Sequence, residues 1–138
     1  MIVLDTNVLS ELVRARPHPK VVAWVSHQAR SQVFTTAISR GEMVFGVLVL
    51  PIGERRRRLQ QEVQAIFDTD MAGRVLPYDG DAAEAHAAFA AARRGQGRPV
   101  SLPDAMIAGI ASSRGATLAT RNLRDFEGCG ITLVDPWD

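Results

Sequence analysis

Short apolar runs alternate with helix-like segments along the whole chain, and this alternation is the feature that most restricts the fold. The runs typical of β-strands lie at residues 2–4, 33–35, 74–76, 117–119 and 131–134. Between them, apolar residues recur with the spacing of amphipathic helices. Strands that alternate with helices form parallel sheets covered by helices on both faces. The pattern therefore predicts an α/β fold with a mainly parallel central sheet.

The helical segments are predicted at residues 8–13, 21–25, 55–67, 79–94 and 105–113, and one further helix carries Glu42. In the segment 55–67, Leu59, Val63, Ile66 and Phe67 share one helix face. The four arginines at 55–58 lie on its polar side. They are typical of a solvated helix face, and the alternative is a phosphate-binding patch.

Length and composition indicate one soluble domain, residues 1–138. The chain is 46% hydrophobic and 22% charged, and its net charge of +1 lacks the strongly basic balance of many nucleic-acid binders. No apolar run approaches the ~20 residues of a membrane span, and no signal peptide is visible. Cys129 is the single cysteine, which excludes an intramolecular disulfide. We expect a cytoplasmic protein.

Four acids follow strands or open helices. Asp5 ends the first apolar run, Asp125 follows the run at 117–120, and Glu42 and Asp104 lie early in helices. Because strand ends and the helix starts that follow them share one edge of a parallel sheet, we expect these carboxylates to converge. Clustered carboxylates repel one another unless a divalent cation neutralises them. The pattern therefore predicts a Mg²⁺ or Mn²⁺ site and hydrolysis of phosphodiesters.

Each acid also has a structural interpretation. Asp5 is placed to cap the helix that follows it. Glu42 fits a capping box that begins at Ser39, and Asp104 fits one that begins at Ser101. Asp125 fits a loop acid paired with a neighbouring arginine, with Asn122 as the other candidate for its place at a metal site. The predicted presence of Asp5 at the same edge favours the functional interpretation.

Several other enzyme classes find little support. The chain has no G-x-S-x-G turn, no G-x-x-x-x-G-K-[ST] loop and no G-x-G-x-x-G fingerprint, and its three histidines are scattered. The segment 5–8 is similar to the start of HAD-type phosphatases, in which the first Asp is a nucleophile. That chemistry needs a lysine late in the fold, and the only lysine, Lys20, comes too early. We expect five arginines to line the mouth of the acid cluster: Arg93, Arg94, Arg98, Arg121 and Arg124. All of these except Arg93 are predicted RNA contacts.

Four segments together resemble one family. MIVLDTNVLSEL, TTAISRGEMVFGV, RPVSLPDAMIAGIA and LATRNLRDF, followed by DPW, occur in this order along the chain. They resemble the PIN-domain ribonucleases, and among these the VapC-type toxins of bacterial toxin–antitoxin pairs, close to the FitB-like branch. The resemblance covers essentially the whole chain.

The resemblance implies an α/β/α sandwich and a Mg²⁺- or Mn²⁺-dependent endoribonuclease. It carries the first three family acids onto Asp5, Glu42 and Asp104. For the fourth acid we favour Asp125, with Asn122 in a supporting role. Further supporting residues are Thr6, beside the first acid, and Asn7, which orients that loop.

The resemblance also implies partners. Such toxins pair with a small VapB-type antitoxin and commonly form homodimers, so the apolar positions 44, 45, 47 and 48 would serve either the core or such contacts. The alternative function is a catalytically silent PIN-fold module that binds RNA or a protein partner.

Overall fold

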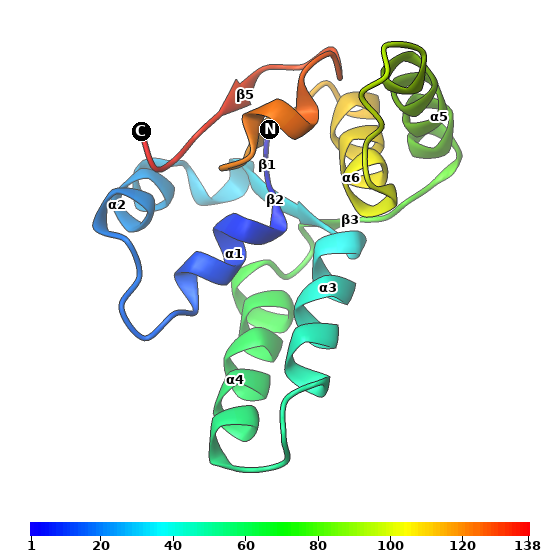
Figure 1. The fold of residues 1–138 in the computed structure, drawn as a ribbon. Helices are drawn as coiled ribbons and strands as arrows, with labels where there is room; N and C mark the ends of the chain where they lie inside the picture. The colour runs from blue at the N-terminus through cyan, green and yellow to red at the C-terminus, as the bar shows by residue number, and fades with distance from the viewer.

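The computed structural model describes residues 1–138 and contains a five-stranded parallel sheet between two layers of helices (Figure 1). The strands are β1 (Ile2–Leu4), β2 (Val33–Thr36), β3 (Val75–Leu76), β4 (Thr117–Ala119) and β5 (Leu133–Val134). They are ordered β3-β2-β1-β4-β5, and every neighbouring pair is parallel. The α/β prediction is confirmed, and the sheet is wholly rather than mainly parallel.

Six α-helices connect the strands: α1 (Thr6–Leu12), α2 (Pro19–His27), α3 (Ala37–Leu48), α4 (Glu54–Ala65), α5 (Gly80–Gly95) and α6 (Leu102–Ser113). Three short helical turns are η1 (Arg30–Gln32), η2 (Ile66–Asp70) and η3 (Leu123–Phe126). All predicted helical segments are helical, although α1 and α6 begin earlier than predicted because Asp5 and Ser101 cap them. None of the six is both long and apolar enough to cross a bilayer.

The two faces of the sheet have separate cores. Val3 and Leu118 pack into a cluster with residues of α5, α6 and η3, whereas the next residues, Leu4 and Ala119, pack with residues of α1 to α4. This separation follows from the strand geometry, since successive side chains point to opposite faces. Both core faces are apolar, as expected for a parallel sheet covered on both sides.

Helices α3 and α4 lie side by side and extend away from the sheet (Figure 1). On α3, Val47 is buried in the core, whereas Val44, Phe45 and Leu48 are exposed, Phe45 to 66%. The arginines at 55–58 lie on the outer side of α4, where Arg57 and Arg58 pair with acids of the same helix. This placement agrees with a solvated helix face, and the phosphate-binding alternative stays a hypothesis.

Helices α5 and α6 pack closely against each other on the sheet face opposite α1 to α4. At Gly109 of α6, an added Cβ would lie 2.4 Å from the carbonyl oxygen of Ala82 and 2.9 Å from the Cβ of His86. Glycine is therefore required here because the two helix backbones approach each other. The contact fixes α6, and with it the position of Asp104 near the N-terminus of this helix.

Candidate active site

Asp5 lies where β1 meets β4. The register pairs Leu4 with Ala119, and the amide of Asp5 donates to the carbonyl of Ala119 at 2.9 Å. The carboxylate is only 4% exposed. Its Oδ1 accepts from the amide of Thr6 at 2.7 Å, and its Oδ2 accepts from the hydroxyl of Thr120 at 2.8 Å. Asp5 therefore caps α1 and is at the same time held in one orientation at the sheet edge.

Glu42 is not part of a capping box, so that prediction is wrong. Helix α3 begins at Ala37, because the hydroxyl of Thr36 accepts from the amide of Ser39 at 3.0 Å. Glu42 consequently lies in the second turn, with its side chain exposed. There the hydroxyl of Thr6 donates to Glu42 Oε1 at 2.7 Å. The Thr6 hydroxyl also lies 2.8 Å from Ser39 Oγ, which links α1 to α3.

Asp104 lies in the first turn of α6. Ser101 is the N-cap, and its hydroxyl accepts from the amide of Asp104 at 3.3 Å. The cap thus uses the backbone amide of Asp104, and the Ser101 side chain also lowers the pKa of the Asp104 carboxyl, against the effect of burial. The carboxylate remains open to the space in front of the sheet edge.

Three of the four predicted acids line one cavity of about 460 Å³. Its wall consists of Asp5, Thr6, Asn7, Ser10, Glu11, Arg14, Glu42, Asp104, Arg121, Asn122 and Trp137. Asp125 is not part of this wall. It lies in η3, exposed, and its charge acts on Asp104, whose pKa it helps to raise. The structure therefore brings Asp5, Glu42 and Asp104 together and leaves Asp125 at their margin.

The electrostatics of the cavity favour the binding of a cation. Burial, with smaller contributions from the charges of Asp104 and Glu42, raises the pKa of Asp5 to about 6, against the hydrogen bonds from Thr120 and Thr6. The pKa of Asp104 is also raised, chiefly by burial and then by Asp125 and Glu42. None of the four acids forms an ion pair. Negative charge thus accumulates here, and no arginine of the wall forms an ion pair with these acids.

The donor chemistry fits Mg²⁺ or Mn²⁺, which prefer hard oxygen ligands. Carboxylate oxygens from three separate elements and the amide of Asn122 meet around the same space. The side chains do not form a preformed cage, since no three His, Cys, Asp or Glu side chains are close enough together to hold an ion as they are. A cation would therefore have to draw these carboxylates together.

A hydrogen-bond network at Thr120 ties the supporting residues to Asp5. The Thr120 hydroxyl accepts from Asn122 N at 3.1 Å and from Asn7 Nδ2 at 3.4 Å. Asn7 Oδ1 in turn accepts from Arg121 N at 3.5 Å. Because Thr120 is fully buried, it fixes both the Asp5 carboxylate and the start of the loop that carries Asn122. The sequence alone did not indicate this role for Thr120.

Buried Arg93 holds the other end of the same loop. Its guanidinium donates to the carbonyls of Arg98, Arg124, Asp125 and Glu127 at 2.8 to 3.3 Å. An arginine with five fixed donors suits such a set of converging carbonyls. No local sequence signal distinguishes Arg93 from the exposed arginine that follows it.

The arginines expected at the mouth of the site differ in position. Arg121 lines the cavity, whereas Arg94, Arg98 and Arg124 are exposed outside its wall. Arg98 is also neutralised by Glu127 at 2.8 Å. The lysine required by HAD-type chemistry is absent from the cavity too, because Lys20 lies at the start of α2.

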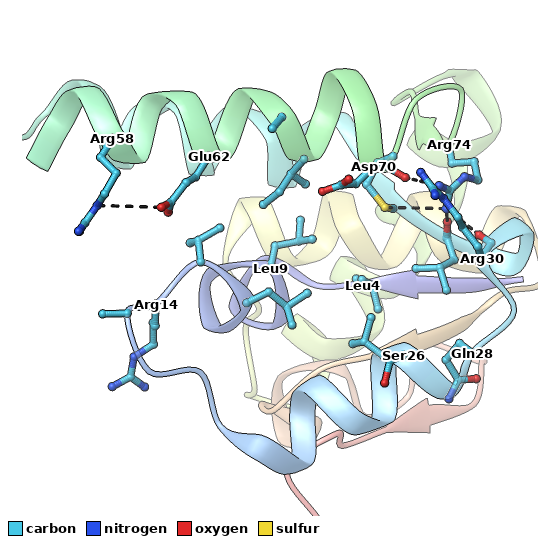
Figure 2. A pocket seen from close by; sticks show the side chains of 18 residues that line it. Leu4, Leu9, Arg14, Ser26, Gln28, Arg30, Arg58, Glu62, Asp70 and Arg74 are labelled. Atoms are coloured by element: carbon cyan, nitrogen blue, oxygen red, sulfur yellow. Dashed lines mark hydrogen bonds and ion pairs between the residues drawn. The ribbon is translucent and has the colours of Figure 1, made fainter.

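A second cavity, of about 920 Å³, lies between α1, α2 and α4, and Figure 2 shows the side chains that line it. Leu4, Leu9 and Val33 are among its apolar residues. Polar groups border it, such as the pair formed by Arg58 and Glu62 at 4.0 Å. It contains none of the predicted site residues and has the character of an apolar groove.

Comparison with known proteins identifies the family. The PIN domain family model matches residues 2–128. The chain is 38% identical over 138 residues to VapC ribonuclease Y4jK of Sinorhizobium fredii, covering 100% of this chain and 99% of the relative. It is 33% identical to toxin FitB of Neisseria gonorrhoeae, covering 99% of both chains. Among solved structures, FitAB bound to an IR36 DNA fragment superimposes with a TM-score of 0.93 at 33% identity, covering 100% of this chain and 96% of the other. The chain therefore belongs to the PIN-domain family, and its relatives include VapC- and FitB-type toxins.

Proposed function

We propose that this protein is a Mg²⁺- or Mn²⁺-dependent endoribonuclease and the toxin of a toxin–antitoxin pair. The observation that carries the proposal is the group of Asp5, Glu42 and Asp104, which line one cavity without a single ion-pair partner. Carboxylates that repel one another around a buried Asp5 are costly unless a cation joins them. The similarity to VapC ribonuclease Y4jK supports RNA as the substrate.

Asp5 and Asp104 would hold the principal ion, with Glu42 and Asp125 completing the site directly or through water. When bound, the ion lowers the pKa of the attacking water and stabilises the charge that develops on the phosphate. The chain's own residues orient these ligands. Thr6 and Thr120 fix both oxygens of Asp5, and Thr6 also holds Oε1 of Glu42, which leaves Oε2 free for a solvent molecule.

Arginines in the cavity wall would allow an RNA strand to approach the acidic site. Arg121 lines the cavity and has no carboxylate partner, so its charge is available to a phosphate. Arg14, also in the wall, is paired with buried Glu11 at 3.1 Å. Arginine binds phosphate through two parallel hydrogen bonds, which makes Arg121 the stronger candidate of the two.

Two surfaces suit the partners of such a toxin. The apolar groove between α1, α2 and α4 suits an apolar segment of a VapB-type antitoxin (Figure 2). The exposed Phe45, Leu48 and Val49 on and after α3 suit a homodimer contact. We expect the whole chain to act as one domain in the cytoplasm, where the lone Cys129 stays reduced.

The test is cleavage by purified, antitoxin-free protein. A mixed RNA pool is incubated with wild type, Asp104→Asn and Glu84→Gln, with Mg²⁺, Mn²⁺ or a chelator. Glu84 is an exposed acid of α5 outside the cavity, so its variant is the matched control. We expect cleavage that needs the metal, survives in Glu84→Gln and is lost in Asp104→Asn. Full activity of Asp104→Asn would refute the assignment, and a folded wild type that binds RNA without cutting it would favour the silent binding module.

A further inference from the structure

The wall of the acid cavity contains one feature that the metal chemistry does not use, the tryptophan near the end of the chain. Trp137 is the only hydrophobic residue among the eleven that line this cavity. The other ten are polar or charged. A large aromatic surface beside a phosphodiester-cleaving site is unexpected if the site binds only a metal and a phosphate group.

Trp137 is held at its backbone and at its side chain. Its amide donates to Asp135 Oδ1 at 2.8 Å, and its side chain lies near the buried Glu11, where it helps to lower the pKa of that carboxyl. Glu11 accepts in addition from the amide of His18 and from Arg14, both at 3.1 Å. These hydrogen bonds outweigh burial, which acts in the opposite direction, and lower the pKa of Glu11. Trp137 is half-buried, and part of its side chain packs against the core cluster beneath α1 to α4. Trp137 is thus a rigid part of the wall.

The guanidinium of Arg121 lies over this ring. Its Cζ is 5.1 Å from the ring centroid, within the range of a cation–π contact. Arg121 has no carboxylate partner, in contrast to Arg14 in the same wall. An aromatic ring and a guanidinium that no carboxylate holds match the two parts of a nucleotide, since a base stacks on an aromatic ring and a phosphate binds arginine.

We propose that Trp137 and Arg121 form a nucleobase subsite beside the scissile phosphate. An unstacked RNA base takes the place of the Arg121 guanidinium on the cavity side of Trp137, and Arg121 turns to the adjoining phosphate. The inference rests on the proposed ribonuclease function and narrows its substrate to unpaired RNA, since bases in a duplex are not free to stack on protein. The alternative is that Trp137 only anchors the end of the chain on the core.

The first experiment measures binding without cleavage. The chain has two tryptophans, so in the Trp24→Phe variant the fluorescence comes from Trp137 alone. Labelled single-stranded RNA is titrated in chelator, and its anisotropy reports binding independently of the tryptophan signal. We expect saturable quenching with single-stranded RNA and none with an abasic strand of the same length or a fully paired duplex. RNA that binds without quenching, quenching of equal size by the abasic strand, or no binding at all would overturn the proposal.

The second experiment compares Trp137→Phe with Trp137→Leu, each checked for folding by thermal unfolding. Stacking on an aromatic side chain contributes ~1–3 kcal/mol per base, which corresponds to about 5- to 150-fold in affinity. We expect Trp137→Leu to weaken single-stranded RNA binding at least fivefold, Trp137→Phe to retain most of it, and neither to change binding of the abasic strand. An equal loss on the abasic strand would show that Trp137 acts only through the fold.

These measurements keep the two proposals separable. If the protein binds RNA in a base-dependent way but cleaves no RNA with or without Mg²⁺ or Mn²⁺, the ribonuclease proposal is refuted and the base subsite remains. Metal-dependent cleavage that is unchanged in Trp137→Leu would remove the subsite and leave the ribonuclease.

Discussion

Replacing Asp5 with asparagine should make the metal-free protein more stable at neutral pH. The reason is that burial raises the pKa of Asp5 from 3.8 to about 6. The folded state therefore holds the proton more tightly than the unfolded state does. The stabilisation from this group is complete below pH 3.8 and is lost as the pH rises through 6.

The size of the effect follows from the same shift. At 1.36 kcal/mol per pKa unit, ionised Asp5 lowers the free energy of unfolding by about 3 kcal/mol above pH 6. Asparagine carries no charge and keeps an oxygen for the amide of Thr6, but the Thr120 hydroxyl loses its acceptor, at a cost of about 1 kcal/mol. We therefore expect Asp5→Asn to be about 2 kcal/mol more stable than wild type at pH 8 and less stable than wild type at pH 4.

The assay is urea unfolding of wild type, Asp5→Asn and Glu84→Gln from pH 4 to pH 8 in chelator. The informative quantity is the difference in unfolding free energy between variant and wild type, because contributions of distant groups cancel in it. For Glu84→Gln the unfolding curves should follow those of wild type. A difference for Asp5→Asn that does not change with pH, or that favours wild type at pH 8, would refute the reasoning.

Three further outcomes are expected. Gly109→Ala should lower the free energy of unfolding by about 1–3 kcal/mol, because the new Cβ would lie 2.4 Å from the carbonyl of Ala82. Gly46→Ala should raise the free energy of unfolding by about 1 kcal/mol in the same urea titration, because nothing lies within 4 Å of its new Cβ. Two changes of the same sign would contradict this. Arg93→Met should lower the melting temperature and reduce RNA cleavage, because the carbonyls of Arg124, Asp125 and Glu127 in one loop, and that of Arg98, lose their donor. Unchanged cleavage would show that the loop does not position the site. Saturating Mg²⁺ should raise the melting temperature of wild type in calorimetry but not that of Asp104→Asn. The reason is that an ion that binds only the folded state stabilises this state. An equal rise in both proteins would show that the ion binds elsewhere.

Much of the fold, and part of the candidate site, could be predicted because both depend on the local pattern of the sequence. The apolar runs at residues 2–4 and 117–119 are strands as predicted, and the helical segments between the predicted strands all form. The position of Asp5 at a strand end also follows from the pattern, since the residue after a buried parallel strand must lie at the sheet edge. The local errors concern element boundaries and the cap of α3, where Thr36 rather than Ser39 is the cap, because Thr36 ends β2 and continues directly into the helix.

The features that could not be predicted from the sequence depend on contacts between distant residues. Thr120 and Asp5 are 115 positions apart, and only the pairing of β1 with β4 brings them within 2.8 Å. Trp137 reaches the acid cavity because β5 adds to the edge of the sheet beside β4 and directs the end of the chain back towards α1.

The sequence by itself thus determined the type of fold, the strands and the acids that end or follow them. Only the tertiary structure decided that three of the acids share a cavity while Asp125 stays at its margin, and that Arg121, unlike Arg98, faces them without a partner. The physical reason is that periodicity and capping act over a few residues, whereas the order of strands in a sheet sets which distant side chains meet.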